Sequence, residues 1–113
     1  SQVLFNSGAT KLSRSGESLL EKLVPVLLAT DGIIFIEGHT DNMPIQSEAF
    51  ASNWELAAAR ATEVLQFFVI EGVPKEKLRA VSYGDTKPLV SNDSEQNRQQ
   101  NRRVSLLLQS PLH

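Results

Sequence analysis

The sequence contains no cysteine among its 113 residues. The fold therefore uses neither disulfide bonds nor a thiolate metal site, and cysteine usage says nothing about the redox compartment. No apolar run approaches the roughly 20 residues that a helix needs to span a bilayer, and no signal peptide is present. Because the chain begins with Ser1 and not with Met, we expect it to be a piece excised or processed from a longer protein.

Excess positive charge is also absent. The chain has 11 lysines and arginines against 13 aspartates and glutamates, for a formal net charge of −2. Nucleic acid binding usually requires a basic face, so we expect no nucleic-acid partner. With 41% hydrophobic residues, an ordinary globular value, residues 1–113 are expected to form one domain with a single modest core, and 110–113 a loose tail.

Catalytic motifs are equally sparse. No serine lies in a G-x-S-x-G elbow, and no glycine-rich phosphate loop is present. Glu37, His39 and Asp41 alternate along an expected strand end, where their side chains would point the same way and could form a metal or acid/base site. Zinc usually takes further His or Cys ligands, and the other histidine, His113, is the last residue. We therefore expect no catalytic residue, no metal and no other cofactor, and interpret His39 as a structural residue that orients the following loop through hydrogen bonds.

The chain does contain a clear succession of apolar patterns. Short runs rich in β-branched and aromatic residues predict strands at residues 1–5, 33–39, 78–83 and 104–109. Apolar residues at helical spacing predict two main helices, from about 15 to 29 and from 52 to 72. A kink or a break, but no second element, is expected at Pro25, and short helical turns are expected near 74–77 and 95–100.

The second main helix carries the strongest local signals. Ser52-Asn53-Trp54-Glu55 matches a capping box, in which the Ser52 hydroxyl accepts the backbone N–H of Glu55 and the Glu55 side chain reaches back. Gly72 is placed to end the helix. The small residues Ala57-Ala58-Ala59 would let the helix lie close to a sheet, and Gly38 would let another segment approach the strand backbone.

The element order is strand, helix, strand, helix, strand, strand. Right-handed crossovers would place both main helices on one face of a mixed sheet, which gives an α+β two-layer sandwich. The unbroken apolar run at 33–36 best fits a central strand. The other face of the sheet would be partly open or covered by a partner.

Two opposite charges lie at the ends of the most informative stretch, residues 37–60. Asp41 follows a strand end, and Arg60 lies in the second turn of the helix among alanines that leave room for its long side chain. An arginine in a helix is usually solvated or paired with a neighbour, here Glu55 or Glu63, and that reading stays open. Because the strand end lies beside the start of the helix, we expect Asp41 and Arg60 to face each other across a shallow pocket and to hold one small zwitterionic group.

Four motifs occur in the order and spacing typical of the OmpA C-terminal-like domain: Gly38-His39-Thr40-Asp41, Asn53-x-x-Leu56, Ala59-Arg60-Ala61 and Asn101-Arg102-Arg103-Val104. The sequence resembles this family over nearly its whole length, from Val3 to Leu108. Within the family, Met43-Pro44-Ile45 followed by Ser52-Asn53-Trp54-Glu55-Leu56 is similar to the MotB/PomB branch, the peptidoglycan-anchoring subunit of the flagellar stator.

The resemblance implies non-catalytic binding of peptidoglycan stem peptides through meso-diaminopimelate. Asp41 would take the ammonium group, and Arg60 would take the carboxylate through its planar fork. Thr40 and Asn53 would complete the hydrogen bonds, and Leu56 and Ala57 would form an apolar wall. Arg103, from the last motif, would brace loop carbonyls or carboxylates beside the pocket.

The resemblance also implies a periplasmic location and a longer parent chain. The parent would be anchored in the inner membrane by one upstream helix, form a homodimer and associate with a MotA/PomA-type membrane partner. Two alternatives stay open. An outer-membrane lipoprotein or porin-linked anchor would keep the ligand and change the parent, although the Pro44 loop and Trp54 argue against it. A metal-dependent cell-wall hydrolase would instead use Glu37, His39 and Asp41.

Overall fold

A computed structural model describes residues 4–6, 9–45 and 49–110 of the chain. In chain order these residues form α1 (Arg14–Glu21), α2 (Val24–Ala29), β1 (Ile33–His39), α3 (Asn53–Ile70), the 3₁₀ turn η1 (Lys75–Lys77), β2 (Leu78–Gly84), α4 (Glu95–Asn101) and β3 (Arg103–Gln109). No helix among these residues is both long and apolar enough to cross a membrane.

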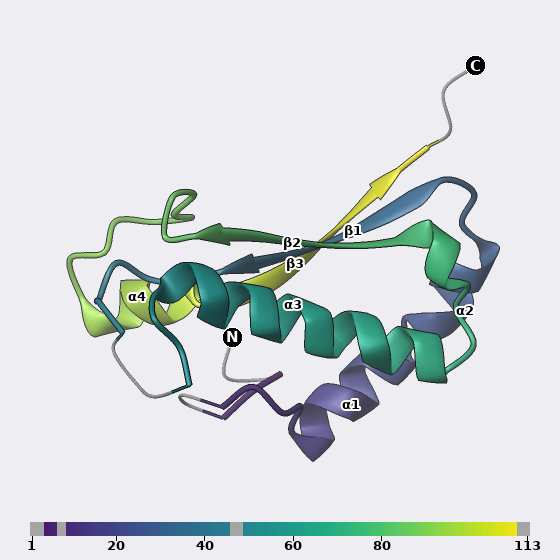
Figure 1. Cartoon of the computed structure of the whole chain (residues 1–113), viewed down its shortest axis with the longest axis horizontal. Coiled ribbons are helices and arrows are strands. Elements are labelled where there is room, and N and C mark those ends of the chain that lie inside the picture. The colour runs from purple at the N-terminus through teal and green to yellow at the C-terminus, as the bar shows by residue number, and fades with distance from the viewer. Residues whose placement is uncertain (1–3, 7–8, 46–48, 111–113) are drawn as a thin grey trace.

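The three strands form one mixed sheet in the order β2-β1-β3. The central strand β1 is parallel to β2 and antiparallel to β3. Helix α3 runs along one face of this sheet, with α1 and α2 beside it (Figure 1). The α+β class, the mixed sheet and the central position of the 33–39 strand are therefore confirmed.

The core lies between the sheet and these helices. Ile34 and Ile36 point from β1 toward the helices and are fully buried, as are Val64 and Phe68 of α3. The opposite face of the sheet is less covered, since Leu107 on β3 is 51% exposed. This face is partly open, as the two-layer arrangement predicts.

The strand expected at residues 1–5 does not join the sheet in its described part. Residues 1–3 lie outside the described residues, Leu4 lies in a turn, and Phe5 pairs with Leu12 in an isolated antiparallel bridge. Both Leu4 and Phe5 are nevertheless core residues. An apolar run is compatible with a strand or with another buried segment and does not specify a pairing partner. The described sheet has three strands where four were expected.

The first expected helix is divided in two. The Ser13 side chain accepts the backbone N–H of Gly16 at 2.9 Å, so α1 begins at Arg14. The chain turns at Lys22 and Leu23 and continues as α2, which has Pro25 in its first turn. Proline is tolerated there because the first backbone N–H groups of a helix have no partner within the helix. A break was expected near Pro25, but the expectation that no second element follows is wrong.

Helix α3 begins and ends close to the residues that its sequence signals predicted. Ser52 caps it by accepting the backbone N–H of Trp54 at 3.2 Å, and its hydroxyl donates to the Glu55 carboxylate. The cap therefore uses Trp54, and not Glu55, as the backbone donor. Gly72, with a φ of 102°, follows the last turn in the left-handed region that favours glycine.

The backbones of β1 and α3 meet at Gly38. A Cβ atom on Gly38 would lie 2.2 Å from the carbonyl oxygen of Ala57, so no larger residue fits without moving the helix or the strand. This contact confirms the close approach expected at Gly38 and at the alanine run. It sets the separation between the end of β1, which Thr40 and Asp41 follow, and the second turn of α3, which carries Arg60.

Candidate binding site

The carboxylate of Asp41 is held inside the loop that follows β1. The backbone N–H of Thr40 donates to the Gly84 carbonyl at 2.8 Å, which ties the exit of β1 to the end of β2. The Thr40 hydroxyl donates to the Asp41 carbonyl at 2.8 Å, and Asp41 Oδ1 accepts the backbone N–H of Met43 at 2.9 Å. Asp41 is only 5% exposed, so its charge depends on partners within the protein.

Asn53 joins this loop to the first residue of α3. Its side-chain amide donates to the carbonyls of Asp41 at 3.3 Å and of Met43 at 3.0 Å. Leu56 and Ala57 follow on the buried face of the same helix. The structure therefore brings the predicted loop residues and the start of α3 together, with the polar side chains of Thr40 and Asn53 bonded to protein carbonyls.

Arg60 is a buried cation on the same helix face, 6% exposed. Its Nε donates to the carbonyl of Ala9 at 2.9 Å, and its guanidinium carbon lies 5.2 Å from the centre of the Phe5 ring, a cation–π contact. Among the described residues, no carboxylate forms an ion pair with Arg60, so the pairing with Glu55 or Glu63 does not occur.

The electrostatics place Arg60 near both Asp41 and a second arginine. Burial lowers the pKa of Arg60, the positive charge of Arg102 lowers it further, and the carboxylate of Asp41 opposes these effects. The strand end, α3 and the end of α4 thus contribute one carboxylate and two guanidinium groups to one cluster.

Arg102 lies between two carboxylates. Its Nη1 donates to Asp41 Oδ2, and its Nη2 donates to Glu95 Oε2 at 2.6 Å. Glu95 also accepts from Nε of Arg98 at 3.2 Å. Burial opposes the charge of Arg102, but the hydrogen bonds that Arg102 donates to Glu95 and Asp41, together with the negative charges of these carboxylates, outweigh burial and raise its pKa. The hydrogen bond from Arg102 is also the main reason that the pKa of Glu95 is lowered.

Arg102 and Glu95 were absent from the predicted site. Arg102 is the residue after α4, and its contact with Glu95 spans seven residues, beyond the three- or four-residue spacing of neighbours on a helix face. The predicted residue, Arg103, pairs in register with His39 and donates to the carbonyls of Asn101 at 3.4 Å and Lys87 at 3.2 Å. Arg103 thus contacts loop carbonyls, as its motif suggested, while Arg102 reaches Asp41.

Asn101 fixes the approach of Arg102. Its side chain is fully buried, accepts the backbone N–H groups of Leu89 and Val90, and donates to the Val90 carbonyl and the Asn92 side chain. Every polar atom of the amide is therefore bonded to the loop that precedes α4. This bracing holds the end of α4, and with it the backbone of Arg102, against the loop.

The three residues of the metal-site alternative do not gather in one place. Asp41 is paired with Arg102, whereas Glu37 accepts a long 3.4 Å hydrogen bond from the Tyr83 hydroxyl. In the described part of the chain, no three His, Cys, Asp or Glu side chains come close enough to hold a metal ion. This arrangement gives the metal-dependent alternative no support.

His39 is positioned by packing. Its ring stacks on Tyr83, with centroids 5.3 Å apart, and its buried Nδ1 has no hydrogen-bond partner among the described residues. The expectation that His39 orients the loop through hydrogen bonds is therefore not supported. Burial, followed by the charges of Arg103 and Lys87, lowers the pKa of His39 to about 4.

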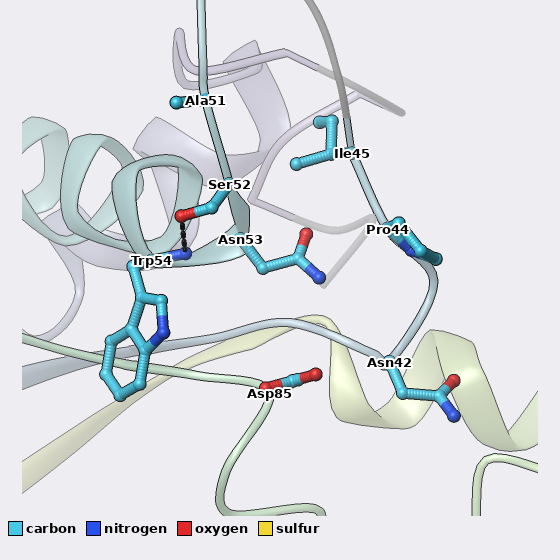
Figure 2. A pocket seen from close by; sticks show the side chains of 8 residues that line it. All are labelled: Asn42, Pro44, Ile45, Ala51, Ser52, Asn53, Trp54 and Asp85. Atoms are coloured by element: carbon cyan, nitrogen blue, oxygen red, sulfur yellow. Dashed lines mark hydrogen bonds between the residues drawn. The ribbon is translucent and has the colours of Figure 1, made fainter.

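A cavity of about 310 Å³ opens beside the charged cluster at the start of α3. It is lined by Asn42, Pro44, Ile45, Ala51, Ser52, Asn53, Trp54 and Asp85 (Figure 2). Asn42 is the neighbour of Asp41 in the chain, and Asn53 is hydrogen-bonded to the Asp41 carbonyl. Neither Asp41 nor Arg60 lines the cavity, and their exposed fractions are only 5% and 6%. This cavity is therefore not the shallow pocket that was expected between the two charges.

Comparison with known proteins agrees with this architecture. The model of the OmpA family matches residues 4–102. The chain belongs to the OmpA family. This OmpA-family chain has the fold of solved MotB-like domains.

Several relatives of this OmpA-family domain are motility proteins. Motility protein B of Bacillus subtilis is 33% identical over 108 residues, which are 94% of this chain and 41% of that protein. A solved MotB-like protein from Desulfovibrio vulgaris is 34% identical with a TM-score of 0.89, covering 99% of this chain and 70% of that one. The periplasmic domain of Helicobacter pylori MotB is 30% identical with a TM-score of 0.83, covering 92% and 68%. The chain spans less than half the length of the curated relatives that it matches first.

Proposed function

We propose that this OmpA-family domain binds peptidoglycan without catalysis, by holding the zwitterionic end of meso-diaminopimelate in a stem peptide. The observation that carries the proposal is Arg60, a buried guanidinium near Asp41 that pairs with no described carboxylate. A buried charge without a counter-ion is unfavourable. A ligand carboxylate would supply the missing anion, and because Nε is bonded to Ala9, the two Nη groups would bind it in the bidentate geometry typical of arginine.

The ammonium group of the same ligand would bind Asp41. Thr40 and Asn53 hold the Asp41 loop in place through its carbonyls, and Leu56 and Ala57 would supply the apolar wall. The positive end of α3 would favour the ligand carboxylate modestly. The cavity beside Asn53 and Trp54 would accept the adjoining part of the stem peptide.

The site suits a weak anchor. One small zwitterion held by one carboxylate and one guanidinium supports a Kd between about 1 μM and 1 mM, or roughly −4 to −8 kcal/mol. Several copies on one assembly would strengthen the attachment. We place the domain in the periplasm, in a flagellar stator subunit held in the inner membrane by one upstream helix. The parent would be a homodimer with a MotA/PomA-type partner. The similarity to motility protein B and to MotB periplasmic domains supports this assignment.

An outer-membrane lipoprotein or porin-linked anchor would use the same site in a different parent. Pro44 and Trp54, the residues that favour the stator branch, both line the cavity beside Asp41. The upstream sequence of the parent distinguishes the two. A lipobox or a barrel would favour the lipoprotein or porin, and one membrane helix with an acidic residue would favour the stator.

The test of the proposed function is binding to purified peptidoglycan sacculi. We expect Asp41→Ala and Arg60→Ala each to abolish co-sedimentation, because each removes the partner of one ligand charge. Circular dichroism should show that both variants stay folded. Arg79→Gln is the matched control, since Arg79 is an exposed arginine on β2 whose side chain, among the described residues, donates to the carbonyls of Glu76 and Leu78 and to no others.

Two outcomes would contradict the proposal. Retained co-sedimentation of both variants would show that the charges do not form the site. Release of soluble muropeptides by the wild-type domain would show a hydrolase and not an anchor.

A further inference from the structure

Arg102 bridges a buried and an exposed carboxylate. The side chain of Asp41 is 7% exposed, that of Glu95 is 58% exposed, and that of Arg102 between them is 26% exposed. One arm of the guanidinium therefore reaches a buried anion, while the other holds an anion at the surface. Arg102 therefore connects the buried Asp41 carboxylate to the exposed Glu95 carboxylate.

This contact uses the oxygen that a ligand would need. Asp41 Oδ1 already accepts the backbone N–H of Met43, and Oδ2 accepts from Arg102. An incoming ammonium group must either share Oδ2 with the positive charge of Arg102, which weakens its binding, or displace Arg102 from that oxygen. Glu95 makes that movement feasible, because Nη2 of Arg102 is already bonded to it and the guanidinium keeps one anionic partner when it leaves the other.

The charges around the site determine which ligand can displace Arg102. The described cluster holds three guanidinium groups, on Arg60, Arg98 and Arg102, and two carboxylates, on Asp41 and Glu95. A ligand that carries only an ammonium group adds to this positive excess and leaves Arg60 without an anion. A zwitterion adds no net charge and brings a carboxylate for Arg60.

We propose that Arg102 is a selectivity latch on the binding site: the latch is closed when Arg102 is paired with Asp41 and open when that pair is broken. The closed latch prevents simple amines from binding to Asp41. A ligand that carries both an ammonium and a carboxylate group displaces Arg102 and opens it. This inference rests on the proposed function. Arg102 then acts through Asp41 and is a positioning residue for the ligand. Glu95 is the alternative partner that lets the latch open.

The test measures two ligands by isothermal titration calorimetry on the 113-residue chain. The ligands are meso-diaminopimelate and 1,5-diaminopentane, which has the two amines and lacks both carboxylates. In the wild-type domain we expect diaminopentane to bind at least about tenfold more weakly. In the wild type, the apparent affinity for diaminopentane is reduced because only the molecules with an open latch can bind it. Arg102→Gln removes the latch, so we expect this variant to bind diaminopentane about three- to tenfold more tightly. The gain in affinity for meso-diaminopimelate should be smaller, because the substitution also removes the positive charge of Arg102 from the neighbourhood of the ligand carboxylate.

Glu95→Gln should act in the opposite direction. Without Glu95, Arg102 loses its second partner and stays on Asp41, so both ligands should bind about threefold or more weakly. Glu95 is exposed, so this variant tests the latch even if Arg102→Gln fails to fold. Arg79→Gln should leave both affinities unchanged.

The outcomes separate the latch from the proposed function. If the wild-type domain does not bind meso-diaminopimelate, the proposed function is wrong and the latch is wrong with it. If the wild type binds but Arg102→Gln weakens both ligands or leaves diaminopentane unchanged, Arg102 has only a structural role. Unchanged binding in Glu95→Gln would also overturn the latch, because opposite effects of the two substitutions are its signature.

Discussion

At the residue scale, His39 is a neutral histidine among positive charges. It is 4% exposed, and burial, Arg103 and Lys87 together lower its pKa to about 4, whereas a histidine in an unfolded chain has a pKa of about 6.5. Between these values the unfolded state binds a proton that the folded state does not. The contribution of His39 to stability is therefore fully present above about pH 6.5 and is lost as the pH falls toward 4.

The prediction compares the wild type with His39→Gln in urea unfolding at pH 7.5 and pH 4.5. Between pH 7.5 and pH 4.5, the free energy of unfolding of the wild type should fall by about 1 to 2 kcal/mol more than that of the variant. This difference is smaller than the full linkage energy, because solvent near the surface screens the charges of Arg103 and Lys87. The difference isolates the contribution of His39, because every other titratable group is present in both proteins. Equal losses in the two proteins would show that His39 titrates as it does in the unfolded chain.

The pair Arg102 and Arg103 shows why the residue-level prediction was incomplete. Neighbouring side chains at the start of a strand point to opposite faces, so a shift of one residue in the expected start of β3 exchanges the arginine that faces Asp41. The sequence could place an arginine near the pocket but could not determine which one. Arg60 was more predictable, because Ala57, Ala61 and Val64 define the buried face of α3 on which it lies.

At the element scale, the contact between β1 and α3 sets the geometry of the site. Gly38 and the Ala57 carbonyl lie so close that a methyl group on Gly38 would overlap the helix backbone. A helix backbone cannot yield as the end of a flexible side chain can. Any larger residue at position 38 must therefore push the strand and the helix apart, and Asp41 and Arg60 with them.

Gly38→Ala should lower the free energy of unfolding by about 2 to 3 kcal/mol, the range expected for overpacking against a rigid neighbour. Urea unfolding measures this loss, and sedimentation with sacculi in the remaining folded protein should show weakened binding. Ser105→Ala is the control, because Ser105 pairs with Glu37 across the same sheet on the face away from the helices. It should change stability by less than about 0.5 kcal/mol. If the Gly38→Ala protein is as stable as this control, the backbones of β1 and α3 can move apart without a loss in the free energy of unfolding.

The elements with both a periodic pattern and a terminal signal were the predictable ones. Helix α3 had its Ser52 cap, its apolar face and Gly72 as a stop, and the structure follows all three. Residues 1–5 had only an apolar run, which is compatible with a strand or with a buried turn. Pairing in a sheet depends on residues distant in sequence, and nothing within such a short segment encodes them.

At the scale of the whole molecule, the proposed binding site is small compared with a body of about 40 × 32 × 25 Å. A weak site of this kind dissociates often, so a stable attachment to the wall requires several sites that bind at the same time. Joining two sites converts the second binding event into an intramolecular one, which can raise the affinity by about 10² to 10⁴ without a new contact. The proposed stator anchor therefore requires that two linked domains bind the wall far more tightly than one.

A tandem fusion of two copies tests this requirement. A Gly/Ser linker of about 50 residues has a root-mean-square reach of about 40 Å, which matches the longest dimension of the domain. We expect the fusion to bind sacculi at least about 100-fold more tightly than one domain in a sedimentation titration. The matched control carries Arg60→Ala in one copy, keeps the same size and linker, and should bind like a single domain. If the fusion with one intact site binds as tightly as the fusion with two, attachment does not depend on a repeated weak contact at Arg60, and a larger surface of the domain must hold the wall.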